Sequence, residues 1–338
     1  MEKLKSVGIL LVVLLASQNS WAWGKRGHQI SGEVAALVAS EVTINNYSAR
    51  FLVEHSYDFG FYNNVPDLVW KNPATYNQEA HNHFMDMEIF ERKLKPHKVD
   101  LKTAFTMTRK EFEKKYPEIE TKEGRAFWRV REFVTNLEAV TQKLRKSSMQ
   151  IKQKQQKGEN VEGLIKNHRK LQERWLVYAG VVGHYVSDMA QPLHATENYD
   201  GQLTEQKGIH HIYETDYVSE LYPQIMVDVL KQAKKQWPKF TKENQSLPLL
   251  DLLLKEVTQS GQDLKTVLDL DKKLGRKDVK KNAQKFKSIL EKNLVLGSLT
   301  LAEIYRRNLG WEFYGEKFYF IDTKPKFITP EHREGGHQ

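Results

Sequence analysis

The chain has 338 residues, of which 40% are hydrophobic and 28% charged, a composition typical of a folded globular protein and unlike that of disordered or fibrous chains. It contains no cysteine, which excludes disulfides, thiolate zinc sites, iron–sulfur clusters and cysteine nucleophiles, so any metal must be held by His, Asp, Glu or backbone groups. The formal net charge of +9 suits a polyanionic partner such as nucleic acid, anionic lipid or a phosphate ester.

Residues 1–22 have the pattern of a secretory signal peptide. Lys3 and Lys5 give a positive start, and the apolar run that follows is shorter than the roughly 20 residues of a membrane-spanning helix. The segment ends in small residues at the positions that signal peptidases recognise, so we predict cleavage between Ala22 and Trp23. The mature protein is then secreted or periplasmic, and an uncleaved membrane anchor is the alternative.

Cleavage at this position would create a metal chelate at the new N-terminus. A free α-amine has a reference pKa of about 8 and loses its proton readily to a metal. The amine and the carbonyl oxygen of Trp23 together form a five-membered chelate, and His28 follows closely enough to complete the site. We therefore predict that Trp23 and His28 share a metal ion.

Hydrophobic residues recur with helical periodicity through most of the chain, and alternating strand patterns are scarce. The clearest helical segments are 30–42, 175–189, 249–257 and 289–305. The apolar run 318–321 is the one segment that resembles a strand. We therefore predict an all-α fold with several packed helices in a single domain over residues 23–322, followed by a C-terminal tail at 323–338.

Two short polar motifs lie in the first third of the chain. Asp67 follows Pro66 in a turn, where an acid could also serve as an ordinary helix N-cap. His81 and His83 lie two residues apart in the next motif. We expect one of the two histidines to be a metal ligand and the other to lie at the surface.

A basic helical insert is predicted at about 95–170. Within it, the stretch 143–157 contains six basic residues and no acidic one, and a second lysine-rich stretch follows at 271–287. Such stretches are either solvated helix faces or a rim that attracts phosphate-rich substrates. Neither has the interleaved aromatic residues expected of a platform that stacks single-stranded bases.

The strongest signal for chemistry lies at the end of segment 175–189. His184 and Asp188 are four residues apart, so they share one face of a helix, and we expect that face to be buried. A buried imidazole and carboxylate need partners, and zinc would satisfy both, whereas a His–Asp hydrogen bond is the structural alternative. His194 follows the helix-ending Pro192 and can reach the same place.

A second pair with the same spacing strengthens the metal interpretation. His210 and Glu214 are also four residues apart, and a glutamate oxygen is a suitable zinc ligand. On a helix the neighbouring His211 points about 100° away and faces Thr215, which is a poor zinc ligand. We therefore predict His210 as the ligand.

Taken in order, these residues resemble a superfamily that contains the fungal single-strand-specific zinc nucleases and the bacterial zinc-dependent phospholipases C. The resemblance covers residues 23 to about 214 and implies an all-α fold that binds three Zn²⁺ ions, with the mature N-terminal tryptophan as one ligand. His83 matches better than His81 because an aromatic residue, here Phe84, follows the ligand in the family. The resemblance implies these ligand sets: Asp67, His83, His184 and Asp188 for one ion; His194, His210 and Glu214 for a second; Trp23 and His28 for a third, with Asp188 bridging.

The resemblance also implies an activity, the hydrolysis of a phosphate ester. Zinc lowers the pKa of water to about 7 and so supplies a nucleophile at neutral pH. Asp67 would be both a ligand and the group that orients the water and accepts its proton. Phe84 would stack on a base of the substrate, and Lys71 would stand where the nuclease branch often has an arginine that grips phosphate.

The sequence carries features of both branches. The start Trp23-Gly-x-x-Gly-His28 resembles the nucleases, whereas Glu214, where nucleases usually have aspartate, resembles the phospholipases. The leading hypothesis is a secreted nuclease or 3′-nucleotidase acting on single-stranded DNA and RNA. The alternatives are a phospholipase C acting on phospholipids and a non-enzymatic protein that binds zinc or nucleic acid. We expect a monomer that has no obligate protein partner.

Overall fold

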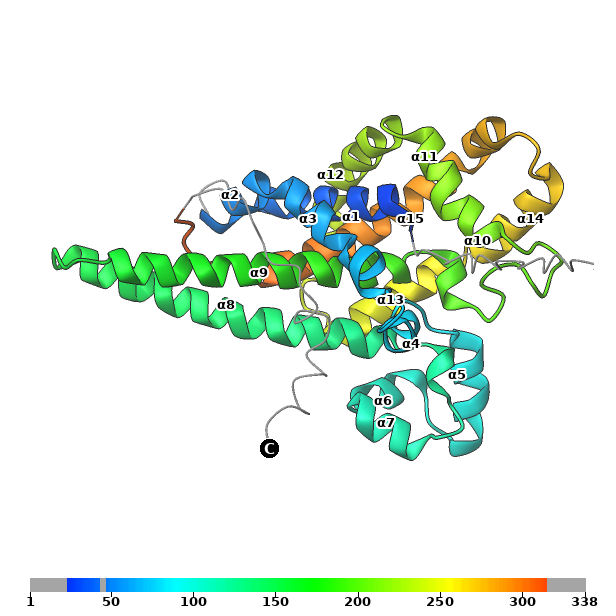
Figure 1. The fold of residues 1–338 in the computed structure, drawn as a ribbon, viewed down its shortest axis with the longest axis horizontal. Helices are drawn as coiled ribbons and strands as arrows, with labels where there is room; N and C mark the ends of the chain where they lie inside the picture. The colour runs from blue at the N-terminus through cyan, green and yellow to red at the C-terminus, as the bar shows by residue number, and fades with distance from the viewer. Residues whose placement is uncertain (1–22, 43–46, 315–338) are drawn as a thin grey trace, which may run out of the picture.

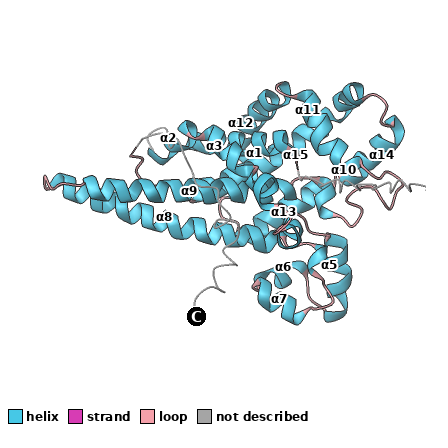
Figure 2. Ribbon diagram, viewed as in Figure 1, coloured by secondary structure: helices cyan, strands magenta, loops and turns pink. Residues whose placement is uncertain are grey.

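The computed structural model describes residues 23–42 and 47–314. Over these residues the chain is an all-α single domain, which confirms the predicted fold class (Figure 2). The β pairing in the described part is limited to one isolated bridge, between Met85 and Gly124. The α-helices have these bounds: α1 Lys25–Ala39, α2 Tyr47–Glu54, α3 Ser56–Asn63, α4 Tyr76–Glu79, α5 Met87–Leu94, α6 Leu101–Thr106, α7 Arg109–Lys115, α8 Ala126–Gln156, α9 Glu162–Met189, α10 Ile209–His211, α11 Tyr217–Leu221, α12 Gln224–Asn244, α13 Leu249–Gly261, α14 Leu264–Leu274 and α15 Val279–Arg307.

The core forms where four helices from distant parts of the chain meet. α1 packs against α3 and α15, and α9 packs against the same two helices (Figure 1). The apolar stripe predicted for α1 faces this core, since Ile30 and Val38 are fully buried. At Gly32 a Cβ atom would lie 2.8 Å from the carbonyl oxygen of Phe59, so a glycine is needed for α1 and α3 to come this close. This packing brings together helices from the first, third and last quarters of the chain.

α8 and α9 form a long antiparallel hairpin whose turn lies far from the rest of the core (Figure 1). α9 begins at Glu162, well before the predicted start at Trp175. The intervening turns are rich in charged residues and partly exposed on the hairpin, so they lack the strong apolar pattern that marks a buried helix.

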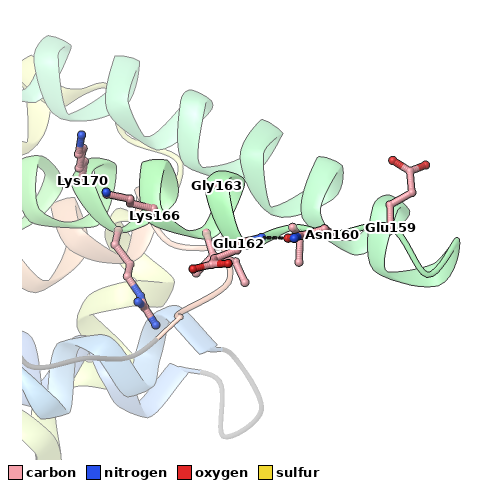
Figure 3. Close-up of a pocket in the computed structure, with 9 residues that line it drawn as sticks. Glu159, Asn160, Glu162, Gly163, Lys166 and Lys170 are labelled. Atoms are coloured by element: carbon pink, nitrogen blue, oxygen red, sulfur yellow. Dashed lines mark hydrogen bonds between the residues drawn. The ribbon is translucent and has the colours of Figure 1, made fainter.

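The basic stretch 143–157 lies on α8 within this hairpin, and most of its charged side chains are exposed. A depression near the hairpin turn is lined by polar side chains that include Asn160 and Lys166 (Figure 3). At about 1.5 Å per helical residue, Lys166 lies roughly 27 Å along α9 from His184. The depression is therefore remote from the buried histidines, and the stretch 143–157 belongs to a solvated face of α8.

The first part of the predicted insert, 95–125, folds with the preceding helix α5 into a small helical lobe of α5, α6 and α7, which lies below the hairpin in Figure 1. Arg125 anchors this lobe to the start of α8. Its buried guanidinium bonds to Glu113 at 3.0 Å and donates to the carbonyl oxygen of Ile119 at 2.8 Å. The predicted insert is thus two structures, the lobe and the hairpin.

Within the described residues, no helix is both long enough and apolar enough to span a bilayer. The predicted signal peptide 1–22 lies outside these residues, as do the strand-like run 318–321 and the tail 323–338. The described chain ends by packing onto the core, where Trp311 contacts the rings of Phe51 and Trp175.

Candidate metal centre

The predicted ligand side chains, Trp23 apart, come together in three buried groups. Within each group the ligand atoms all lie within 4.8 Å of one another, so each group could hold a metal ion. The groups are His28 with His184 and Asp188; Asp67 with His83 and His184; and His194 with His210 and Glu214. His184 belongs to two groups, whereas the family pattern assigns it to one.

Local helical geometry positions most of these side chains. His184 and Asp188 lie one turn apart on the last two turns of α9, and both are fully buried. The helix ends before Pro192, and the 3₁₀ turn Pro192–Ala195 brings His194 back toward the same place. Asp67 lies within a π-helical turn, Pro66–Trp70, that continues from α3, and not in a turn ahead of a helix as the sequence suggested.

Three of the imidazole rings are fixed by a hydrogen bond from Nδ1 to a backbone carbonyl oxygen. The pairs are His184 with Asn63 at 2.7 Å, His194 with His83 at 2.8 Å, and His210 with Tyr199 at 3.0 Å. A carbonyl oxygen can only accept, so Nδ1 carries the proton on each ring and Nε2 is left to bind a metal.

His28 is held in the same way by a side chain. Its Nδ1 lies 2.9 Å from Oγ of Ser187, and that hydroxyl donates its own proton to the carbonyl oxygen of His184 at 3.0 Å. The Ser187 oxygen therefore accepts from His28, which leaves Nε2 of His28 unprotonated in the neutral ring. This nitrogen lies 3.3 Å from Oδ1 of Asp188.

As a result, unprotonated nitrogen atoms face one another. Nε2 of His194 lies 3.0 Å from Nε2 of His210, which in turn lies 2.8 Å from Oε2 of Glu214. Lone pairs at these distances repel each other unless a cation, either a proton or a metal ion, lies between them. Nε2 of His184 lies 2.7 Å from Nδ1 of His83, and the same repulsion arises there when His83 carries its proton on Nε2. The donor set therefore fits a divalent metal.

The carboxylates show the same need for a cation. Asp67 Oδ2, Asp188 Oδ1 and Glu214 Oε1 are buried and make no hydrogen bond, an arrangement that is costly for a charged group. Burial, reinforced by the charge of Asp67, raises the pKa of Asp188 well above its ordinary value. Burial lowers the pKa of His184, so this ring is neutral, which is the form that binds metals.

Asp188 has the geometry of a bridging ligand. Its Oδ1 faces His28, and its Oδ2 lies 3.1 Å from Nδ1 of His83 in a different group. The family resemblance predicts that Asp188 bridges two ions, and the two oxygens are placed so that each could serve one of them.

Trp23 is completely buried beside this cluster. Its indole N–H donates to the carbonyl oxygen of Ser187 at 2.7 Å, next to Asp188. A Cβ at Gly24 would lie 2.4 Å from Oγ1 of Thr215, so only glycine lets the backbone come this close to the segment of Glu214. The predicted ligation by the amine of Trp23 needs cleavage after residue 22 and stays a prediction.

His81 and His211, the two neighbouring histidines that the sequence pattern does not favour as ligands, lie outside the three ligand groups. His81 is half-buried and belongs to the wall of a neighbouring cleft, and its backbone carbonyl accepts from Arg125. His211 is exposed and faces Asp216 at 3.5 Å. The positions chosen in the sequence, His83 and His210, are the ones that the fold brings into the cluster.

A cleft of about 560 Å³ opens onto two of the three groups, since His83, His194 and His210 form part of its wall. The two predicted substrate-binding residues, Phe84 and Lys71, also line it. Nζ of Lys71 lies 2.8 Å from Oδ1 of Asp67, and its side chain is only 9% exposed. The positive charge of Lys71 therefore lies between the cleft and the ligand cluster.

Sequence reasoning missed the residues that orient the ligands. Besides Ser187 and Asn63, Gln191 donates from Nε2 to Oε2 of Glu214 at 3.1 Å. The buried carboxylate of Glu79 lies 3.7 Å from Nε2 of His83. Ser187 and Gln191 adjoin the predicted ligands in the sequence, and Glu79 lies four residues before His83, so local spacing could have indicated these three. Nothing local marks Asn63, because its contact with His184 joins two helices.

Asp86 is a further cleft residue that the sequence did not single out. It is 7% exposed, and its Oδ1 has no hydrogen-bond partner. Burial, followed by the charges of Glu88, Glu197 and Glu123, raises the pKa of Asp86 to about 8. The cleft therefore contains a carboxyl group that is protonated at neutral pH and can donate a hydrogen bond.

This raised pKa gives a stability prediction. Between about pH 4 and pH 8 the unfolded chain releases the Asp86 proton while the folded protein retains it, so ionisation disfavours folding increasingly as pH rises. We expect the free energy of unfolding of Asp86→Asn, relative to that of the wild type, to increase by roughly 1 kcal/mol for each pH unit across this window. Denaturant unfolding with chelator at pH 5, 7 and 9 measures the difference, and a pH-independent difference would contradict the assignment.

The chain matches no protein-family model and no curated protein among those to which it was compared. Its own geometry therefore defines the site: three groups of buried His, Asp and Glu side chains, two of them bordering one cleft, each able to hold a metal ion.

Proposed function

We propose that the protein is a secreted zinc-dependent hydrolase of phosphodiester bonds, most specifically a nuclease or 3′-nucleotidase for single-stranded DNA and RNA. The observation that carries this proposal is the convergence of three metal-ligand groups, two of which border one cleft. Zinc suits the donor set, because zinc binds both imidazole nitrogens, which are ligands of intermediate hardness, and carboxylate oxygens. Zinc ions bound there would make a water molecule nucleophilic at neutral pH and would neutralise charge on the phosphate.

The chain's own groups supply the remaining functions. Asp67 Oδ2 makes no hydrogen bond within the protein and can accept a proton from an attacking water. Burial lowers the pKa of Lys71, but the hydrogen bond to Asp67 and the combined charges of Asp67, Asp188 and Glu214 raise it overall, so the ammonium group stays protonated. It can therefore bind a phosphate oxygen while it holds Asp67 in place.

The cleft wall favours a nucleic acid substrate. Phe84 is half-buried in it, and Tyr76 and Tyr199 are 40% and 46% exposed there. Aromatic faces at a cleft can stack on nucleic acid bases without requiring a particular sequence. The protonated carboxyl of Asp86 could donate a hydrogen bond to a base edge.

The second candidate is a phospholipase C, favoured by a different feature of the same cleft. Acidic Glu197 and Glu123 lie in its wall together with Tyr76 and Tyr199. Aromatic rings with nearby carboxylates are a usual binding site for a quaternary ammonium such as choline. A purely structural zinc protein is less well supported, because His194, His210 and Glu214 form a three-residue group and so leave a fourth position open.

A substrate panel tests the proposal. Mature protein beginning at Trp23 would be loaded with zinc and incubated with single-stranded DNA and with phosphatidylcholine, each with and without chelator. We expect cleavage of the DNA, loss of cleavage with chelator, and recovery when zinc is added back. Release of phosphocholine from the lipid with intact DNA would support the phospholipase instead. Turnover of neither substrate by fully zinc-loaded protein would support a binding protein.

A further inference from the structure

The buried carboxylate of Glu79 lies beside His83, on the side of the ring that faces away from the cluster. His83 is the one histidine of the three ligand groups that presents Nδ1, and not Nε2, to the cluster. The other four rings present Nε2 to the cluster and have Nδ1 fixed from outside. Its Nδ1 lies 3.1 Å from Asp188 and 3.7 Å from Asp67. Its Nε2 is buried and makes no hydrogen bond; the carboxylate oxygen Oε1 of Glu79 lies 3.7 Å from it, within ion-pair range but too far for a hydrogen bond. Glu79 is fully buried and is not itself a member of any ligand group.

Glu79 is held firmly by groups from two other helices. Nη2 of Arg129, on α8, lies 3.1 Å from Oε2, and the hydroxyl of Tyr185, on α9, donates to Oε1. The amide of Asn82 adds a third hydrogen bond, to Oε2 at 3.2 Å. Three donors and complete burial leave this carboxylate little freedom, so it can act as a fixed reference for the His83 ring.

Arg129 is in turn confined by aromatic rings. Its guanidinium carbon lies 5.7 Å from the ring centroid of Trp70, 4.8 Å from that of Phe133 and 5.3 Å from that of Tyr185. The arginine is completely buried, so its charge must be neutralised by a partner of opposite sign. Glu79 and Glu132, each 3.1 Å from the guanidinium, supply that charge, and the pair with Glu79 links α8 to the metal-ligand cluster.

We propose that Glu79 is a positioning residue for the metal centre: it holds the proton of His83 on Nε2 and thereby turns Nδ1 toward Asp67 and Asp188. This inference rests on the proposed metal site and extends it to an outer carboxylate whose negative charge, 3.7 Å from Nε2, favours the Nε2-protonated tautomer of the ligand. Without Glu79, His83 can place its proton on Nδ1, and that tautomer cannot ligate through the nitrogen that faces the cluster.

The test compares Glu79→Gln with Glu256→Gln, the same change at another fully buried glutamate that makes no hydrogen bond and belongs to no ligand group. Zinc affinity is measured by competition with a chelator, and the His83 tautomer by the ¹⁵N shifts of labelled histidine, assigned with His83→Gln. We expect Glu79→Gln to bind zinc at the Asp67–His83–His184 group about 10- to 100-fold more weakly and to lose the signal of an Nε2-protonated His83. Glu256→Gln should leave both properties unchanged.

Glu79→Gln removes one of the two carboxylates that pair with Arg129 and leaves only Glu132, at 3.1 Å, so the variant could fail to fold. The double variant Glu79→Gln, Arg129→Met removes both charges, and it should fold and show the same loss of zinc affinity. An unchanged zinc affinity and an unchanged His83 signal in either folded variant would overturn the proposal. These readouts do not depend on hydrolysis, so a protein that cleaves no phosphate ester but loses zinc on this change would refute the proposed activity and leave the role of Glu79 intact.

Discussion

Replacing His184 with alanine is expected to remove zinc from two of the three ligand groups and to abolish hydrolysis. His184 supplies Nε2 to both the group of His28 and the group of His83, whereas the His194 group shares no residue with either. Bound zinc should therefore fall from three ions per chain to about one. Elemental analysis of purified protein measures this number, and the substrate panel measures activity.

The same substitution should also remove most of the stability that metal contributes. A ligand present at a thousand times its dissociation constant stabilises the folded state by about 4 kcal/mol. Zinc should consequently raise the unfolding temperature of the wild type by several degrees, and chelator should reverse the increase. His184→Ala should show only the smaller increase that comes from the His194 group.

His211→Ala is the matched control, because this exposed histidine adjoins the cluster in sequence but belongs to none of the groups. It should retain three zinc ions, full activity and the thermal response of the wild type. If His184→Ala still binds three zinc ions tightly, the two groups that contain His184 are not the zinc sites.

The second large effect is expected for Asp67→Asn, which should lower the rate of hydrolysis by about 10²- to 10⁴-fold while the protein remains folded. Asparagine keeps the shape and one carbonyl oxygen, so part of the zinc binding survives. It cannot accept a proton from water, and it loses the charge that holds Lys71 at 2.8 Å. Single-turnover cleavage at saturating zinc separates this loss of rate from a loss of metal.

Asp58→Asn is a suitable control, because Asp58 also pairs with a histidine, His55, at 2.7 Å but lies outside the ligand groups. Its rate should equal that of the wild type. Full activity of zinc-loaded Asp67→Asn would mean that another group accepts the proton, and the role assigned to Asp67 would be wrong.

Sequence reasoning performed best where the relevant geometry is local. The spacing of four residues between His184 and Asp188, and again between His210 and Glu214, places each pair on one helical face whatever the rest of the fold does. The apolar stripe of α1 was recognised for the same reason. By contrast, the apolar pattern predicts that this helix begins at Trp175, about 13 residues after the observed start of α9 at Glu162. The exposed hairpin lacks the apolar periodicity on which such predictions depend.

The sequence by itself determined the all-α class, the kinds of ligand available and the helical pairs, since these depend on composition and on contacts within a few residues. Only the tertiary structure decided which groups share a ligand and which way each ring faces. It joined His83 to Asp188 on α9, brought His28 to the same carboxylate, and paired Glu79 with Arg129 of α8. The physical reason is that a tautomer or a buried charge is fixed by whatever atoms lie within about 4 Å, and in a folded chain those atoms come from distant residues.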